Sequence, residues 1–345
     1  MKVPSFPLAF EVLCLQASDE GREEVLFGDC VSRVRAVIPP FIVGTRFPSV
    51  YFEFPLLGDP FMDVTVLYGE LEPGTRIDSP VAQGSAEMLD WFSAVVEEHP
   101  DVSCGFELDT KDPEVPTAAI HFQPRKHVGL VEPFCAVVGE PERAKLYLDQ
   151  AKRMPEGWAL AFFGMFRGRP GSPLRVCGYL DDSVKERAAE DPRYLAGVFD
   201  EIGFAAYDDQ MLAQVSELMA AAPGSLDYQF DVYPDGSLGD TLGIDAQFEI
   251  EQPEAVWESF ENGAASKLMQ LFEQWGTVDS RWRLGVRATF ARAIPVEGED
   301  GSLQRYSFTL MPQWIKARWK NGTLQPSKLY FLGKAGLLEQ PSERD

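Results

Sequence analysis

The sequence predicts an α+β protein whose centre is a closed antiparallel β-barrel of about ten strands, with the helices on the outside. The hydrophobic spacing gives a helical stretch followed by two consecutive strands, and this order recurs about five times. No helix separates single strands, which argues against the βαβ crossovers of a parallel sheet. Turn-forming residues lie between the strands of a pair, as antiparallel hairpins require.

The first two repeat units span about residues 18–71 and 84–123. Apolar residues three and four positions apart define the helices, and alternation of apolar and polar residues defines the strands. The expected elements, in chain order, are helix 18–38, strands 44–57 and 62–71, helix 85–99, and strands 101–109 and 117–123.

The remaining three units span about 129–180, 183–250 and 253–335. Their expected elements are helix 129–153, strands 158–168 and 174–180, helices 183–203 and 208–222, strands 226–233 and 241–250, helix 253–275, and strands 305–312, 314–320 and 327–333. Residues 281–290 are expected to connect the last helix to its strands. Because the repeat is unbroken, we expect residues 1–345 to form a single domain.

Tight turns support the hairpins and raise the question of how the sheet ends. Turn residues lie at 58–60, 170–173, 234–236 and 321–322, each between strands of a pair. About ten strands in an open sheet would leave two edges with unpaired backbone groups. Closure into a barrel removes both edges, and helices outside it cover one face.

Most of the strands have one apolar face and one polar or mixed face. In strand 174–180, Leu174, Val176 and Leu180 alternate with Arg175 and Tyr179. The same parity places a larger set on the polar face: Glu53, Thr65, Glu107, His121, Gln229, Asp231, Asp245, Gln247, Trp314, Lys316, Arg318, Lys320, Lys328 and Tyr330. This face either lines the inside of the barrel or is the solvated face of an open sheet. Aromatic residues among the cations favour an enclosed binding site.

The charge distribution indicates a small anionic ligand. The formal net charge of −23 would repel nucleic acid and anionic membranes over most of the surface, so neither is expected as a partner. Residues 301–338 nevertheless contain six Lys or Arg residues and no Asp or Glu. A locally cationic segment in an acidic protein is typical of a site for a small anion.

Several other classes of protein and site are not indicated. The sequence has no P-loop, GxGxxG, GxSxG or HExxH motif, and its three histidines leave few candidates for a triad. The five cysteines have no CxxC spacing, so we expect reduced thiols. No uninterrupted apolar stretch approaches the roughly 18 residues of a membrane span. We therefore expect a soluble, cytoplasmic protein without membrane insertion.

Residues on the polar face also carry a resemblance to a known family. They are Lys328-Leu-Tyr330 in the last strand, Trp314-Ile-Lys316-Ala-Arg318 in the strand before it, Arg175 with Tyr179, His121, and the segment 44–53 ending in Glu53. With the fivefold α-β-β-α repeat from about 18 to 335, this pattern resembles the ABBA superfamily of aromatic and cyanobactin-type peptide prenyltransferases. The family's fold is a closed ten-strand barrel, the PT barrel.

The resemblance implies a set of roles for these side chains. Arg175, Lys316, Arg318 and Lys328 would bind the diphosphate of a prenyl donor. Tyr179, Tyr330, Trp314 and His121 would line the barrel, the aromatic rings shielding an allylic cation. Glu53 would accept the proton of the acceptor. Two features depart from the family pattern: Glu53 fits its glutamate position only with a shift, and Ala119 stands where a basic residue is usual.

The expected activity is transfer of an allylic prenyl group from a prenyl diphosphate to an aromatic or peptide-borne nucleophile. The alternative is a catalytically inactive barrel that binds a peptide or a partner protein in a biosynthetic pathway. No cofactor is required, although Mg²⁺ held by Asp231 or Asp245 is possible.

Overall fold

The structure is a computed structural model that describes residues 28–29, 32, 49–68, 85–109, 117–297 and 303–337. Apart from residues 28, 29 and 32, the helix expected at 18–38 lies outside these residues, as does the first part of the strand expected at 44–57. The division into one domain and five repeat units stays a prediction.

Ten strands pair in a ring, every neighbouring pair antiparallel. The ring runs β10, β12, β1, β2, β3, β4, β5, β6, β7, β8, and it closes because β8 also pairs with β10. The bounds are β1 (Ser49–Pro55), β2 (Asp63–Tyr68), β3 (Ser103–Asp109), β4 (Thr117–Gln123), β5 (Trp158–Met165), β6 (Leu174–Leu180), β7 (Leu226–Val232), β8 (Leu238–Gln247), β10 (Leu303–Lys320) and β12 (Lys328–Leu337). The prediction of a closed antiparallel ten-strand barrel is confirmed.

The fifth unit differs in detail from the expectation. The strands expected at 305–312 and 314–320 are one strand, β10, with a bulge between Pro312 and Trp314. A bulge tolerates Pro312, which has no N–H for the ladder. On one side, the first half of β10 pairs with β9 (Phe290–Glu297) and the second half with β8. The short strand β11 (Thr323–Leu324) folds back on the end of β10.

Residues 281–290 were expected to be a connection, and this was wrong. They form helix α12 (Arg281–Arg287) and the start of β9. Trp282 and Val286, four residues apart, are both buried, so tertiary packing stabilises this arginine-rich helix.

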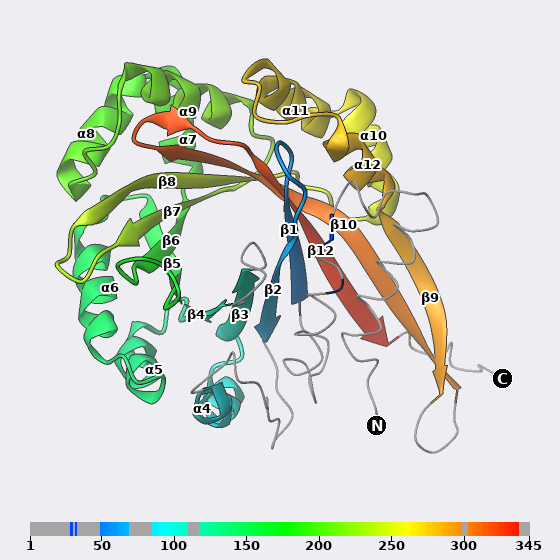
Figure 1. The fold of residues 1–345 in the computed structure, drawn as a ribbon, viewed down its shortest axis with the longest axis horizontal. Coiled ribbons are helices and arrows are strands. Elements are labelled where there is room, and N and C mark those ends of the chain that lie inside the picture. Colours follow the sequence, from blue (N-terminus) through cyan, green and yellow to red (C-terminus); the bar gives the residue numbers. More distant parts are fainter. Residues whose placement is uncertain are drawn as a thin grey trace.

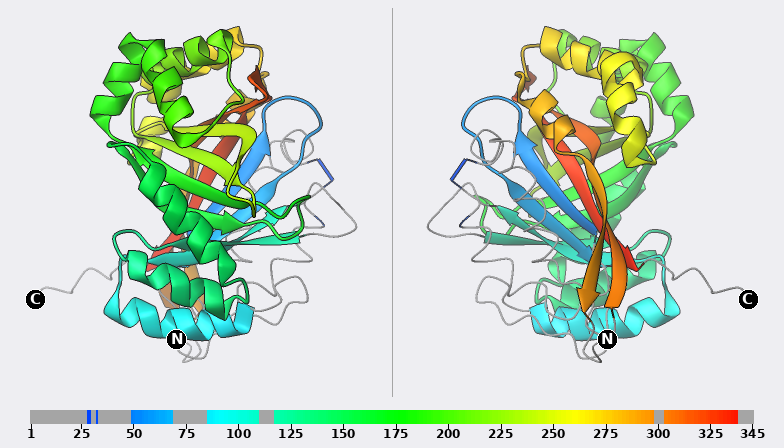
Figure 2. Two further views of the ribbon diagram at one scale, coloured as in Figure 1. Left: turned by 90° about the vertical axis from the view of Figure 1, so that its left-hand side faces the viewer. Right: turned by 90° about the vertical axis from the view of Figure 1, so that its right-hand side faces the viewer.

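The helices lie in an arc around the outside of the barrel (Figure 1), and the side views show them covering much of its outer face (Figure 2). They are α4 (Ser85–Glu98), η1 (Val128–Leu130), α5 (Val131–Val137), α6 (Glu142–Arg153), α7 (Asp182–Glu190), α8 (Pro192–Ile202), α9 (Asp209–Ala221), η2 (Pro253–Ala255), α10 (Val256–Asn262), α11 (Ala264–Gln274) and α12.

Three of the expected helices are each divided in two, at identifiable residues. Between α5 and α6, Gly139 has a φ of +80°, which favours glycine. Pro192 begins α8, and the Asp191 side chain caps it by accepting a hydrogen bond from the N–H of Arg193. Gly263 separates α10 from α11.

The apolar strand face packs under the helices, as predicted. Trp158 of β5 meets Phe199 of α8 with ring centroids 6.4 Å apart, and Trp319 of β10 meets Trp275 at the end of α11 at the same distance. Tyr228 of β7 is fully buried, and its hydroxyl donates to the Trp158 carbonyl. The main core therefore lies between the barrel and the helices, and the polar strand face points inward.

Candidate functional site

The interior face can be followed across the barrel through directly paired residues. Lys328 of β12 pairs with Lys316 of β10, Lys316 with Asp245 of β8, Asp245 with Asp227 of β7, and Asp227 with Tyr179 of β6. Directly paired residues share a face of the sheet. Five side chains that are distant in sequence therefore form one row inside the barrel.

Lys328 is held between two buried carboxylates. Its Nζ lies 3.1 Å from Oδ2 of Asp63 and also contacts Oε1 of Glu53. Burial alone would lower the pKa of Lys328, but the two carboxylates raise it above its ordinary value. Burial alone would raise the pKa of Glu53, but Lys328 and Lys316 hold it below its ordinary value. Glu53 is therefore ionised at neutral pH.

Lys316 stands next to this group and is less tightly paired. Its Nζ donates to the Tyr330 hydroxyl and lies 3.6 Å from Oδ1 of Asp245. The other carboxylate oxygen of Asp245 accepts a 2.7 Å hydrogen bond from Gln229. Burial raises the pKa of Asp245 to about 6, against the opposing effect of Lys316.

Arg175 forms a bidentate ion pair with Asp231. Its Nε and Nη2 donate to the two carboxylate oxygens at 2.9 and 3.3 Å. Its guanidinium carbon also lies 4.5 Å from the ring centroid of Phe166, and the Arg169 guanidinium lies 3.8 Å from the same centroid. The Arg318 side chain is exposed and forms no side-chain hydrogen bond or ion pair within the part of the chain that the structure describes, so it is available to an anionic ligand.

His121 points into the barrel and binds an acid. Its Nε2 lies 3.1 Å from Oε2 of Glu107, and Arg169 lies 3.6 Å from the other oxygen. Burial would raise the pKa of Glu107, but His121 and the nearby arginines lower it well below its ordinary value. The ring of His121 passes over Gly164, its cross-strand partner, where a Cβ would lie only 2.8 Å from Cε1.

Aromatic rings gather beside the cations. Trp314 has its ring centroid 4.8 Å from that of Tyr51 and 5.3 Å from that of Tyr330. Burial raises the pKa of Tyr51 to about 12, and Tyr179 and Asp227 add to the rise, so Tyr51 is close to both. The hydroxyl of Tyr179 accepts a 2.7 Å hydrogen bond from Arg125. The interior thus combines flat apolar surface with fixed charges of both signs.

The structure brings the predicted residues to one interior face. Glu53, Lys328, Lys316, Tyr330 and Trp314 form one connected group. Arg318 lies near enough to Arg175 and Glu53 for their charges to affect its pKa. Tyr179 belongs to the same row of paired residues, next to Asp227. His121 binds Glu107, whose charge in turn affects the pKa of Glu53.

Sequence reasoning missed five interior residues: Tyr51 as an interior ring, Asp63, Arg125, Phe166 and Asp227. Asp63 has the strand parity of Thr65, and Asp227 that of Gln229, so a signal for both existed. Arg125 and Phe166 lie at or beyond strand ends, where parity gives no indication.

No group of three or more His, Cys, Asp or Glu side chains among the described residues forms a metal-binding cluster. The two carboxylates considered for Mg²⁺ already face cations: Asp231 binds Arg175, and Asp245 lies near Lys316 and accepts from Gln229. These residues do not fit a resident magnesium site.

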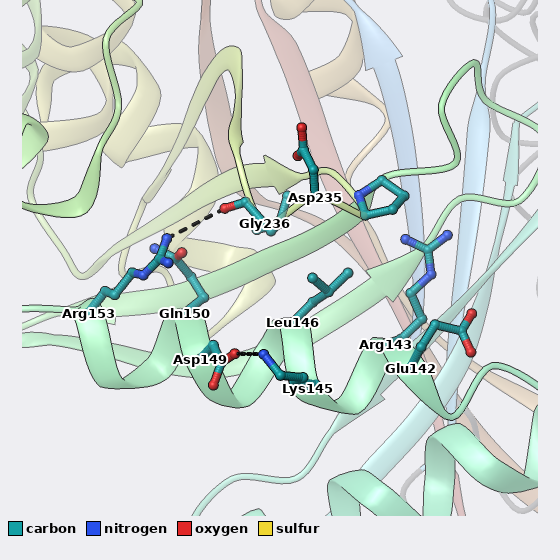
Figure 3. A pocket seen from close by; sticks show the side chains of 11 residues that line it. Glu142, Arg143, Lys145, Leu146, Asp149, Gln150, Arg153, Asp235 and Gly236 are labelled. Atoms are coloured by element: carbon teal, nitrogen blue, oxygen red, sulfur yellow. Dashed lines mark hydrogen bonds and ion pairs between the residues drawn. The ribbon is translucent and has the colours of Figure 1, made fainter.

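A hollow lies outside the barrel, between α6 and the turn joining β7 to β8 (Figure 3). Its volume is about 320 Å³. Its charged groups are largely satisfied: Lys145 pairs with Asp149, and Arg153 donates to the Gly236 carbonyl at 3.5 Å. It shares no residue with the interior site.

Two solved structures resemble this chain along nearly its whole length. One is 5-dimethylallyltryptophan synthase from Streptomyces coelicolor, with a TM-score of 0.51 and 15% sequence identity, covering 96% of this chain and 97% of that chain. The other is 5-dimethylallyl tryptophan synthase from Streptomyces coelicolor in complex with DMASPP and Trp, with a TM-score of 0.50 and 14% identity, covering 99% and 100%. This chain has the ABBA fold.

No protein-family model and no curated protein matches the sequence. At such low identity, the likeness establishes the ABBA fold alone, and function must be argued from the interior of the barrel. None of the helices in the described ranges is long and apolar enough to cross a lipid bilayer.

Proposed function

We propose that the protein transfers an allylic prenyl group from a prenyl diphosphate to an aromatic acceptor inside the barrel. The observation that carries this proposal is the interior face itself, where Lys316, Lys328, Arg175 and Arg318 lie beside the ring cluster of Tyr51, Trp314 and Tyr330. The ABBA fold supports the same assignment.

On the donor side, the cations would bind and stabilise the departing diphosphate. Arg318 has no carboxylate partner among the described residues and offers the first contact. Lys316, Lys328 and Arg175 each face a carboxylate, so the diphosphate would replace those acids as their partner. A diphosphate offers several charged oxygens, and charge-assisted hydrogen bonds to it are strong.

On the prenyl side, aromatic rings would shield the carbocation. The faces of Trp314, Tyr51 and Tyr330 attract a cation through the ring quadrupole. They also exclude the water that would otherwise capture it. Tyr179 and His121 extend the lining, with Tyr179 fixed by Arg125 and His121 by Glu107.

Glu53 would accept the proton that the acceptor loses in the reaction. The allylic C–O bond breaks with its electrons on the diphosphate, a bond forms from the acceptor ring to the allylic carbon, and the acceptor proton passes to the Glu53 carboxylate. In the free protein, Lys328 lowers the pKa of Glu53. When the diphosphate binds Lys328, that restraint weakens, and Glu53 becomes a stronger base as the donor arrives.

The test is calorimetric titration with dimethylallyl S-thiolodiphosphate, a slowly reacting analogue of the donor, alongside inorganic pyrophosphate. We expect the analogue to bind more tightly than pyrophosphate. Arg318→Ala should weaken its binding about tenfold or more, because one charge-assisted contact is lost. Lys145→Ala, which removes an equal charge from exposed α6, should leave the affinity unchanged.

Equal binding to wild type and Arg318→Ala would refute the assignment of the diphosphate site. Binding of the analogue without turnover of any aromatic or peptide-borne acceptor would instead indicate the inactive barrel. A screen of small aromatic molecules and of peptides containing Trp or Tyr would decide the acceptor class.

A further inference from the structure

Three buried polar atoms without a hydrogen-bond partner lie on one stretch of the interior face. They are Oδ1 of Asp227, Oδ1 of Asp245 and Nε1 of Trp314. Asp227 and Asp245 are direct partners across β7 and β8, and Trp314 pairs with Gln247, two residues beyond Asp245 on the same face. Buried polar atoms are rarely left unpaired in native proteins, so this convergence calls for an explanation.

The two carboxylates face each other with little to neutralise them. Like charges directly opposite in an antiparallel pair destabilise the sheet. Asp227 forms no ion pair within the described ranges, and the neutral amide of Gln247 is its hydrogen-bonding neighbour. Asp245 is only 5% exposed, and Lys316 at 3.6 Å is too far from its Oδ1 for a good hydrogen bond. The pair therefore gains from taking up a positive charge. In the free protein that charge is a proton, because burial and the neighbouring Asp245 raise the pKa of Asp227 to about 8, and a cationic group of a ligand can replace it.

Aromatic rings border this pair. Tyr179 is the cross-strand partner of Asp227 on the side away from Asp245. Tyr51 lies close enough to Asp227 for its charge to contribute to the raised pKa of Tyr51. The Trp314 ring is tilted by 37° against the Tyr51 ring, with the two centroids 4.8 Å apart. A ligand that matches this site has a cationic amine to meet the two acids and an aromatic group to pack against the rings.

We propose that Asp227 and Asp245 together bind a positively charged nitrogen of the acceptor, a protonated amine carried on a short chain from its aromatic ring. This inference rests on the proposed function and specifies the substrate class of the same site. The ammonium group donates to Oδ1 of Asp227 and to Oδ1 of Asp245, the two oxygens without a hydrogen-bond partner, and the proton that the acid pair holds in the free protein passes to solvent. When the donor diphosphate draws Lys316 away, Asp245 loses its nearest cation, and the ammonium takes that place. The acceptor therefore binds more tightly after the donor.

The test compares amines with neutral molecules of nearly the same shape. Tryptamine against tryptophol, and phenethylamine against phenethyl alcohol, are titrated into the full-length protein with dimethylallyl S-thiolodiphosphate present and absent. We expect each amine to bind about tenfold more tightly than its alcohol, the difference that one hydrogen bond to a charged group typically makes. The preference should increase when the analogue is present.

Asp227→Asn keeps the shape of the side chain and should remove the preference for amines while leaving the affinity for the alcohols unchanged. Asp240→Asn is the matched control, because Asp240 lies on the same strand as Asp245 and bonds Asn321 outside the interior row. Thermal unfolding confirms that each variant is folded.

Equal affinities for amine and alcohol, no measurable binding of either amine at millimolar concentration, or a preference that survives Asp227→Asn would overturn the inference. The same titrations separate it from the proposed function. If the thiolodiphosphate binds but the amine preference is absent, only the acceptor assignment fails. If the thiolodiphosphate does not bind, the prenyltransferase proposal fails as well.

Discussion

Replacing Lys328 with methionine should destabilise the protein through the two carboxylates that it leaves behind. Lys328 Nζ contacts Glu53 and lies 3.1 Å from Asp63, whose side chains are 7% and 5% exposed. Neither carboxylate can regain its hydration when the ammonium group is removed. Breaking a buried ion pair costs about 3–5 kcal/mol. Because the Lys328 side chain is 25% exposed, we expect the lower end, about 3 kcal/mol.

That loss corresponds to a shift in Tm of about 4 °C, since unfolding 345 residues carries an entropy of about 2.1 cal/mol/K per residue. The shift should depend on pH. In the wild type, Lys328 lowers the pKa of Glu53, so this contribution is present above the ordinary pKa of 4.5 and is lost as pH falls through the lower folded value. In the variant, unopposed burial raises the pKa of Glu53. The destabilisation should therefore be full at pH 7 and smaller near pH 5.

Circular dichroism melts of the wild type, Lys328→Met and the double variant Lys328→Met/Glu53→Gln at both pH values provide the measurement. The second substitution removes one stranded charge, so it should restore about half of the lost Tm at pH 7. A loss of the same size at pH 5 and pH 7, with no recovery in the double variant, would show that the methionine acts through packing and that this electrostatic reasoning is wrong.

Three further outcomes follow from the same geometry. Gly164→Ala should lower the free energy of unfolding by about 1–3 kcal/mol, because the new Cβ would lie 2.8 Å from the His121 ring. Gly197→Ala in α8 should raise it by about 0.5–1 kcal/mol, because a Cβ there would have no neighbouring side chain or loop within 4 Å. Thermal melts measure the sign of both changes. Burial is the larger cause and the charge of Asp245 the smaller one that together raise the pKa of Asp227 from 3.8 to about 8. Between these two pH values the folded state holds a proton that the unfolded state has lost, so the free energy of unfolding falls as the pH rises from about 4 to about 8. The Tm advantage of Asp227→Asn over the wild type should accordingly grow from pH 5 to pH 8, and an advantage independent of pH would contradict it. Binding of the thiolodiphosphate should survive EDTA within about threefold, since a tenfold loss already corresponds to about 1.4 kcal/mol and would indicate a metal contribution.

The strands were predictable because their signal is local. Alternation over 174–180 and 117–123 matches β6 and β4 at both ends, and both strands have an apolar outer face that fixes the period. The prediction divided β10 into strands 305–312 and 314–320, and the division falls next to Pro312, which lacks the N–H of a strand residue. In the structure β10 is continuous because it has a bulge after Pro312 and because its first half pairs with β9 and its second half with β8. Both are tertiary features.

For the candidate site, strand parity predicts which side chains face inward but not which of them meet. Arg175 and Asp231 were both placed on the interior face, yet their ion pair depends on the register of β6 against β7. Lys328 reaches Asp63 across 265 positions of sequence, through the closure of β12 onto β1 and β2. Such contacts follow from the barrel as a whole, and no local pattern encodes them.

The pairing of interior cations with acids bears directly on the proposed chemistry. A barrel lined by unopposed cations would bind any small anion, whereas Lys328, Lys316 and Arg175 face carboxylates that a weak anion cannot displace. A diphosphate has the charge and the number of oxygens to compete for several cations at once. Each carboxylate that it releases regains a higher pKa in its buried site. For Glu53, this means that base strength increases only when the donor is in place, so proton removal from the acceptor is coupled to the presence of the prenyl group that replaces the proton.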